Sequence, residues 1–128
     1  YLIHYRLNLD MSLIRDRVTL AQLLENTQFK WHGVRLNEPD WSEHSHALAA
    51  TFIGMNRRRE MHIMGNAFRK PLDFMLPPTG AGGSPWRLLI DTSLDSPDDI
   101  HPPDAAPEIG TPDYRVEAYS IVLAGRPL

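Results

Sequence analysis

Residues 31–42 read Trp-His-Gly-Val-Arg-Leu-Asn-Glu-Pro-Asp-Trp-Ser, a stretch in which tryptophans flank turn-forming residues. Trp31 and Trp41 lie at its two ends, and short hydrophobic runs flank the segment. Asn37 and the Pro39-Asp40 pair supply turn chemistry, because Asn and Asp bond their own backbone and Pro fixes φ. The stretch therefore predicts a strand, a turn and a second strand.

The tryptophans that flank this turn have two interpretations. Large, rigid aromatic faces belong to the core in most proteins, and we expect that position for Trp31 and Trp41. In a sugar-binding protein such faces stack on pyranose rings instead. The third tryptophan allows the same two interpretations, so the candidate carbohydrate-binding residues are Trp31, Trp41 and Trp86.

Alternating apolar residues predict further strands on the C-terminal side of this turn. Residues 46–55 are apolar on both alternating faces, which predicts a strand that is covered on both sides and central to the fold. Residues 61–68 return as its hairpin partner, and alternating strands follow at 72–76 and 86–91. In residues 114–123 the apolar phase changes, which indicates a bulge or a switch between strands.

Three segments between these strands are predicted to be loops. Residues 56–60 form a charged turn, and residues 77–85 are a flexible loop because they are rich in proline and glycine. Residues 92–112 are acidic and proline-rich. We expect them to form a surface loop that is long for a compact domain.

The N-terminal residues carry two further patterns. Residues 1–11 alternate between apolar and polar side chains, which predicts a long strand. That strand would either join the sheet or form an exposed arm able to pair with a second copy of the chain. Residues 19–26 begin with a capping box and predict a short helix.

Composition limits the class of protein. The chain has 128 residues, enough for one domain that buries roughly two thirds of its unfolded surface. It has no cysteine and a net charge of −3, which fits a cytoplasmic protein and argues against a nucleic-acid partner. No apolar run is long enough to span a membrane, and the opening residues lack the features of a signal peptide. With frequent proline and glycine, these observations predict an all-β fold, an antiparallel β-sandwich with one short N-terminal helix.

Several short motifs occur in an order that resembles a known family. They are WHGV at 31–34, PDWS at 39–42, SH at 45–46, NAF at 66–68, PL at 71–72, LPP at 76–78, WR at 86–87, IDT at 90–92 and SPDDI at 96–100. This ordered set is similar to the C-terminal domain of bacterial glycogen-debranching enzymes, the isoamylase-type members of the α-amylase superfamily. Arg69 and Lys70 depart from the family pattern, which usually has an aromatic residue and an acid before the Pro-Leu pair. The resemblance begins at about residue 19, so it implies an N-terminal segment, 1–18, outside the family pattern and a C-terminal β-sandwich domain, 19–128.

The resemblance implies a non-catalytic C-terminal domain of a larger enzyme. The parent enzyme would hydrolyse α-1,6-glucosidic branches in glycogen or its limit dextrins. Its catalytic residues would lie on a barrel outside these 128 residues. The implied partners are that barrel and, through surface aromatic residues, an α-glucan.

The residues of this chain indicate no catalytic centre of their own. The carboxylates of the 92–112 loop are separated by prolines, and nothing there predicts the facing pair that glycoside hydrolysis requires. His44 and His46 would share one face of a strand, and Glu43 and His32 could complete a zinc site. A chance His-x-His pair is the simpler interpretation. We therefore expect no catalytic residue, no metal and no cofactor.

Two main functional hypotheses remain. A structural domain that packs on a catalytic barrel predicts an exposed apolar patch where the barrel would lie. A free-standing carbohydrate-binding module predicts aromatic side chains exposed in one plane, drawn from Trp31, Trp41, Trp86, Tyr114 and Tyr119. A third and weaker hypothesis is a small metal-dependent enzyme that uses His32, His44 and His46.

Overall fold

The computed structural model describes residues 29–53 and 58–128. These ranges contain no helix, and therefore none that could cross a membrane. Their strands are β1 (Phe29–His32), β2 (Ala47–Ile53), β3 (Arg59–Asn66), β4 (Leu72–Met75), β5 (Arg87–Asp91), β6 (Asp113–Val116) and β7 (Ser120–Pro127). Every strand pair is antiparallel, which confirms the all-β antiparallel class. The strand expected at 1–11, the helix expected at 19–26 and the start of the charged turn lie outside the described residues.

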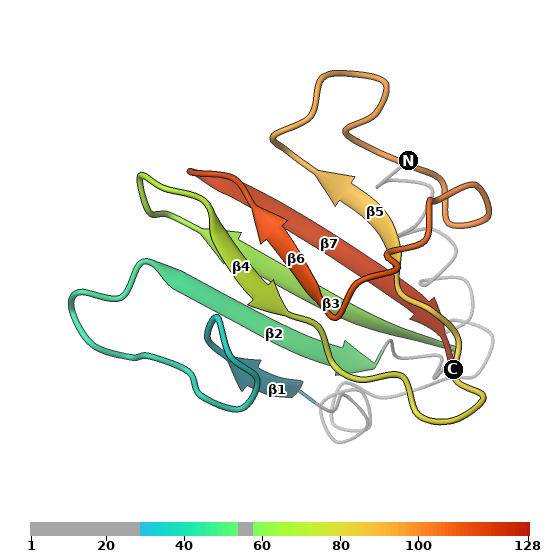
Figure 1. Ribbon diagram of the computed structural model, residues 1–128, viewed down its shortest axis with the longest axis horizontal. Helices are drawn as coiled ribbons and strands as arrows, with labels where there is room; N and C mark the ends of the chain where they lie inside the picture. The colour runs from blue at the N-terminus through green and yellow to red at the C-terminus, as the bar shows by residue number, and fades with distance from the viewer. Residues whose placement is uncertain (1–28, 54–57) are drawn as a thin grey trace, which may run out of the picture.

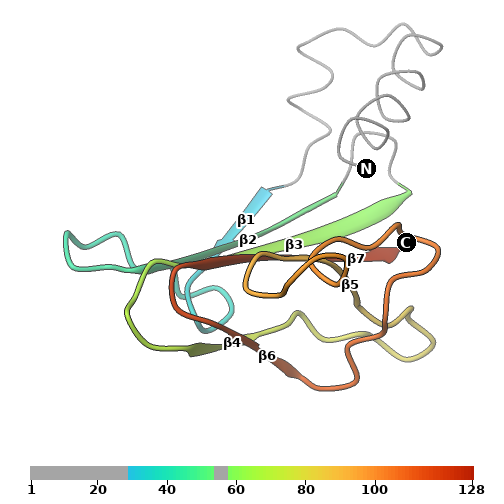
Figure 2. The same ribbon diagram turned by 90° about the horizontal axis from the view of Figure 1, so that it is seen from above.

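The strands form two layers (Figure 1). Five strands make one sheet in the order β1-β2-β3-β7-β5, and β4 and β6 make a second, two-stranded sheet. Figure 2 shows the small sheet lying along one face of the large one. Between them lies the core, in which Phe74 and Val116 of the small sheet join Met64 and Val122 of the large sheet. We call this covered side the inner face of the five-stranded sheet, and the opposite side the outer face.

The alternation of apolar and polar residues predicts the burial of side chains correctly in the small sheet but less well in the large sheet. On β4, Phe74 is buried while Asp73 and Met75 are exposed, as the alternating pattern predicts. On β2, residues 49–51 are all buried, so the middle of the strand is covered on both sides. The prediction that this strand is central is wrong, because β3 occupies the middle of the sheet and β2 lies second from the edge.

The stretch at 31–42 folds as a strand followed by a turn, but its second strand begins later than expected. β1 ends at His32, and β2, its antiparallel partner, begins only at Ala47. Asn37 has a φ of 61°, a left-handed conformation that Asn tolerates better than most residues. Gly33 is required at the start of the connection, because a Cβ there would collide with the carbonyl oxygen of Glu38.

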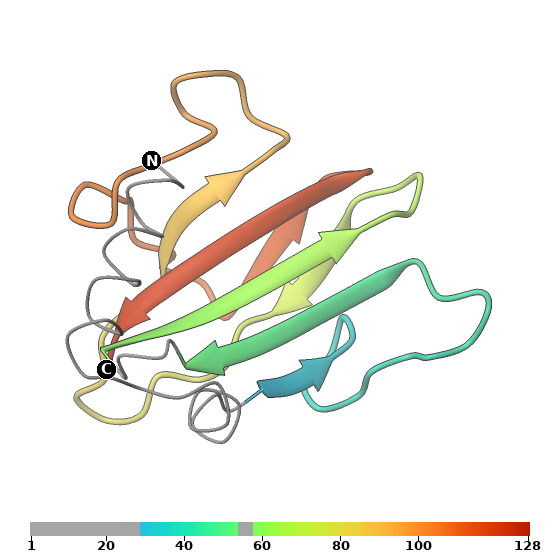
Figure 3. The ribbon, with the colours of Figure 1, turned by 180° about the vertical axis from the view of Figure 1, so that it is seen from behind.

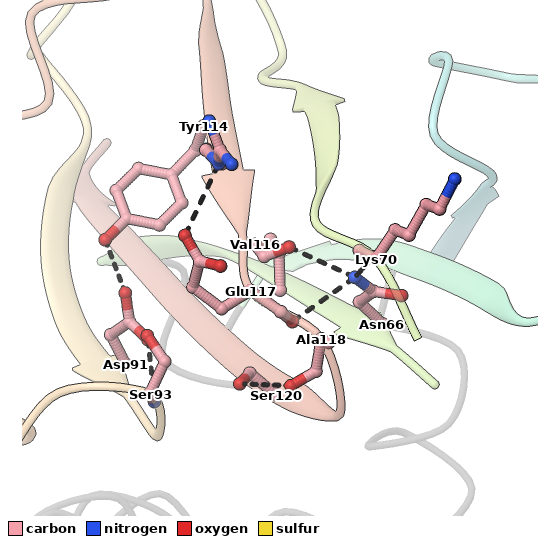
Figure 4. Close-up of polar contacts among 10 residues, drawn as sticks. Asn66, Lys70, Asp91, Ser93, Tyr114, Val116, Glu117, Ala118 and Ser120 are labelled. Atoms are coloured by element: carbon pink, nitrogen blue, oxygen red, sulfur yellow. Dashed lines mark hydrogen bonds and ion pairs between the residues drawn. The ribbon is translucent and has the colours of Figure 1, made fainter. Parts of the chain in front are cut away.

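The phase change expected in 114–123 is a switch from one sheet to the other. β6 belongs to the small sheet and β7 to the large one, and Tyr119, with a φ of 55°, lies between them. The buried Asn66 side chain holds this corner together. Its Nδ2 donates to the carbonyl oxygens of Lys70, Val116 and Glu117 at 2.9, 3.1 and 3.2 Å (Figure 4).

A second polar contact joins the two sheets (Figure 4). The Tyr114 hydroxyl on β6 donates to Oδ2 of Asp91 on β5 at 2.6 Å. The backbone amide and hydroxyl of Ser93 donate to Oδ1 of the same carboxylate. Burial and the contact with Asp91 raise the pKa of Tyr114 well above its usual value. The tyrosine therefore stays protonated and remains a hydrogen-bond donor.

The acidic loop covers the edge of β5. Four backbone hydrogen bonds of 2.8–2.9 Å join them, from the amides of Leu88, Asp91, His101 and Ile109 to the carbonyls of Pro107, Asp99, Leu89 and Trp86 respectively. Ala106 of the loop is buried against Met61 and Leu89. The loop is therefore ordered, and it occupies an edge that would otherwise be open to another strand.

Candidate functional site

The outer face of the five-stranded sheet is apolar. Side chains alternate along a strand, and Ala49, Met64 and Val122 point into the core. Their neighbours therefore point outward, and the large apolar residues that pair on this face are Phe29, Trp31, Leu48, Phe52, Met61, Ile63, Ile121 and Leu123, of which Met61 is buried against Ala106 of the acidic loop. Five of them, Phe29, Trp31, Leu48, Ile63 and Ile121, rank among the exposed large hydrophobic residues. Figure 3 shows the sheet from this side.

An aromatic strip runs along the β1 edge of the outer face. The Phe52 and Phe29 rings stack at 5.3 Å, Phe29 and Trp31 lie 5.0 Å apart, and Trp31 meets Trp41 edge-on at 5.5 Å. Trp31 is 45% exposed and Trp41 is 65% exposed. The expectation that these two tryptophans belong to the core is therefore wrong. Trp31 lies on the outer side of an edge strand, and Trp41 lies in the β1–β2 connection.

Trp86 occupies the opposite kind of environment. It is 3% exposed, and its Nε1 donates to the carbonyl oxygen of Pro77 at 2.8 Å. The Arg126 guanidinium lies over its ring at 4.4 Å and is paired with Glu60 at 2.6 Å. Trp86 therefore has the core role, and its ring offers no open face to a sugar.

A groove of about 670 Å³ lies at one end of the outer face. Trp41 and Tyr119 both line it, and Tyr119 is 74% exposed. Leu48 and Ile121 flank Gly65 across three neighbouring strands, so the missing side chain of Gly65 hollows the floor. We call this hollow the Gly65 groove.

Polar groups border the Gly65 groove on the side of the β1–β2 connection. Oδ1 of Asp40 accepts the backbone amide of Ser42 at 3.0 Å, and this bond lowers the pKa of Asp40. The His46 ring stacks on Phe68 with centroids 5.6 Å apart. Asp40 and His46 also line a neighbouring hollow of about 350 Å³. The sequence motifs pointed to this connection, and Tyr119 was among the candidate exposed aromatic residues, but nothing in the sequence indicated the contribution of Gly65 from β3.

The three histidines considered as metal ligands do not form one site. His44 and His46 line the same hollow. His32 is buried, where its Nδ1 accepts the amide of Asn37 at 2.8 Å and its Nε2 lies 2.8 Å from the Thr51 hydroxyl. Both ring nitrogens of His32 are thus engaged. Within residues 29–53 and 58–128, no group of three or more candidate ligands gathers around one point.

His32 belongs to a buried polar chain with Thr51 and His62. Because Nδ1 of His32 accepts from Asn37, its proton lies on Nε2, which donates to Thr51. The Thr51 hydroxyl then donates to Nδ1 of His62 at 2.9 Å. Burial, and secondarily His32, lower the pKa of His62 to about 4. Nε2 of His62 has no hydrogen-bond partner in the described part of the chain.

Two acidic side chains of the 92–112 loop form ion pairs with arginines. Glu108 binds Arg87 of β5 at 3.0 Å, and Asp104 lies 3.8 Å from Arg59 of β3. In each pair the acidic side chain is exposed to solvent, so each pair contributes little to stability. Their positions anchor the loop to the sheet.

Comparison with known proteins identifies related sequences. Residues 30–125 match the family model described as "Isoamylase 1-3, C-terminal". The chain is 32% identical over 112 residues to Isoamylase 3, chloroplastic, of Oryza sativa subsp. japonica, and 30% identical over 85 residues to Isoamylase SU1, chloroplastic, of Zea mays. These alignments cover 87% and 66% of this chain, but only 13% and 10% of the two relatives.

Proposed function

This chain belongs to the isoamylase 1-3 C-terminal domain family, and we propose that it is the non-catalytic C-terminal domain of a debranching glycoside hydrolase. The parent enzyme would hydrolyse α-1,6-glucosidic branches, with its nucleophile and acid on a catalytic barrel outside these residues. The family match and the small share of each relative that the chain spans both support a domain of a larger enzyme.

The outer face is the surface we assign to the contact with that barrel. Phe29, Trp31 and Ile63 lie on it together and are all substantially exposed. A contiguous exposed apolar surface of this kind marks a site of protein contact. The exposed apolar outer face is the observation that carries this assignment.

The finer parts of the proposal extend beyond the described residues. We infer a complete β-sandwich domain that begins at residue 19, with a short helix at 19–26 ahead of β1. A cytoplasmic location and pairing of two copies through the 1–18 segment stay predictions. The two plant relatives are named as chloroplastic, which is a property of those proteins.

The test compares this chain with the complete enzyme that carries it. The complete enzyme should release reducing ends from glycogen by cutting α-1,6 bonds, and this chain alone should release none. Deleting residues 29–128 from the complete enzyme should lower its melting temperature, because the barrel would lose the packed domain. Hydrolysis by this chain alone, or a complete enzyme without α-1,6 activity, would contradict the proposal.

A further inference from the structure

The Gly65 groove differs from the rest of the outer face because polar groups border it. We propose that this groove binds an α-glucan chain, with Trp41 and Tyr119 as its aromatic platforms. The proposal deepens the proposed function, on which the identity of the sugar rests. It assigns to the domain a carbohydrate contact separate from the catalytic residues of the barrel.

Two exposed rings line the groove, one braced by a neighbouring ring and the other on a constrained backbone. Trp41 is braced edge-on by Trp31 at 5.5 Å, which limits its motion while most of its surface stays open. Tyr119 has a φ of 55°, an uncommon conformation for a residue with a side chain. Such conformations persist where the surrounding structure imposes them, and they gather at ligand-binding positions. A pyranose ring presents an apolar C–H face that suits exposed rings of this kind.

The polar part of the argument rests on Asp40 and His46. The Ser42 amide donates to Oδ1 of Asp40, and the Ser42 side chain also bonds this carboxylate, whose remaining lone pairs can accept a sugar hydroxyl. Phe68 holds the His46 ring by stacking. The ring nitrogens of His46 have no hydrogen-bond partner among residues 29–53 and 58–128, and they are open to a hydroxyl group. A glucan supplies hydroxyls at the rim of each ring and an apolar face between them.

The character of the groove favours a neutral polyol over other ligands. Its lining contains Asp40 and neither lysine nor arginine, so a phosphate or nucleic acid would find no cation there. Its volume of about 670 Å³ falls within the range of small-molecule sites. A purely apolar partner would bury the remaining acceptor sites of Asp40 and the ring nitrogens of His46 without giving them hydrogen bonds, which is unfavourable.

The groove can be closed without removing either aromatic platform. A Cβ at Gly65 would have only the Leu48 carbonyl oxygen within 4 Å, at 3.7 Å, so a side chain fits the strand and fills the floor. Valine suits a strand position. Gly65→Val therefore tests the groove, Trp41→Ala and Tyr119→Ala test the platforms, and Phe29→Ala is the matched control, since Phe29 is an exposed ring outside the groove.

The experiment is a calorimetric titration of this chain with maltoheptaose, and with cellohexaose as a β-linked comparison. We expect saturable binding of maltoheptaose that Trp41→Ala, Tyr119→Ala and Gly65→Val each weaken by about tenfold or more. Phe29→Ala should leave the affinity within about twofold. Thermal melts of each variant show whether it is folded, and Trp41→Phe, which keeps an aromatic face, should restore binding.

The outcomes separate this inference from the proposed function. Absence of maltoheptaose binding by the wild-type chain, or equal binding by folded groove variants, would overturn the glucan site. If the complete enzyme still cuts α-1,6 bonds in that case, the proposed function stands. If the groove binds glucan but the complete enzyme does not hydrolyse α-1,6 bonds, the glucan site is supported and the proposed parent activity is contradicted. The titration is repeated on the complete enzyme, where loss of the effect of Trp41→Ala and Gly65→Val would show that the barrel covers the groove and would overturn the glucan site.

Discussion

The three tryptophans show how one residue type takes different roles in one sheet fold. Trp31 and Trp41 contact each other on the outer side of the β1 edge, where both remain exposed. Trp86 enters the core, donates its indole hydrogen to Pro77 and carries Arg126 on its ring. All three lie beside strand-like sequence, so their neighbours in the chain do not distinguish them. Their burial depends on which face of the sheet is covered.

Replacing Trp86 should destabilise the chain far more than replacing another aromatic residue of the sheet. Trp86→Ala removes a buried ring and should lower the free energy of unfolding by about 3–5 kcal/mol. Phe29→Ala, at an exposed position, should lower it by about 1 kcal/mol or less. Urea denaturation measures both values. Equal losses in the two variants would place Trp86 outside the core.

The buried histidine chain predicts a dependence of stability on pH. The pKa of His62 is about 4 in the folded chain and 6.5 is its ordinary value, so only the unfolded state takes up a proton between these values. Stability is therefore full above pH 6.5 and falls as the pH is lowered towards 4. The unfolding free energy should drop by about 2–3 kcal/mol between pH 7 and pH 4.5 through this group.

Urea denaturation of the wild type and of His62→Gln at the two pH values isolates this contribution. Glutamine cannot take up the proton, so the variant should lose less stability on acidification than the wild type. The same loss in both proteins would show that other groups, chiefly carboxylates, account for the whole effect.

At the scale of elements, β5 and the acidic loop form one unit. Residues 92–112 are acidic and proline-rich, and no alternating pattern marks them as partners of a sheet. Their backbone nevertheless exchanges hydrogen bonds with β5 at Leu88 and Asp91. These hydrogen bonds run between backbone groups, which leave no pattern in the side chains, so the sequence predicted a loop and could not predict where it lies.

Hydrogen exchange should detect this pairing. The amides of His101 and Ile109 donate to carbonyls of the β5 segment at 2.8 Å, so they should exchange at least about tenfold more slowly than an exposed loop amide. Ala81 is the internal comparison, because its amide has no acceptor in the described part of the chain. Exchange at the Ala81 rate would mean that the loop separates from β5 in solution.

At the scale of the whole molecule, the unusual feature is a sheet with apolar side chains on both faces. The inner face is covered by β4 and β6, while the outer face leaves Ile63, Leu48 and Ile121 substantially exposed. An antiparallel sheet with one solvated face normally carries polar residues there. The exposed apolar face agrees with a domain that packs against a larger body.

A charge on the outer face should lower the stability of the complete enzyme but have little effect on the stability of this chain alone. Ile63→Glu, at a position 37% exposed, should change the unfolding free energy of this chain by less than about 1 kcal/mol. In the complete enzyme it should lower the melting temperature, because the charge would be buried against the barrel. Met75→Glu, on the exposed side of β4, is the matched control. Equal melting temperatures for the two complete enzymes would exclude the outer face as the contact surface.

The all-β class, most of the strands and the family could be predicted from the sequence alone. Alternation is a local property, so residues 72–76 revealed a strand whose buried and exposed positions were both predicted correctly. The order of short motifs revealed the relationship to isoamylases, which the family match confirmed. These properties depend on residues close together in the chain or on their order along it.

Only the folded structure shows which face of the sheet is covered, and this determines where each candidate binding residue lies. Alternation divides a strand into two sides, but pairing and layer packing determine which side meets the core. Trp31 and Trp86 could therefore exchange roles without any change in local pattern. The Gly65 groove combines Trp41 from a connection, Gly65 from β3 and Tyr119 from the switch between sheets. Residues so distant in sequence become neighbours only when β2, β3 and β7 pair in register.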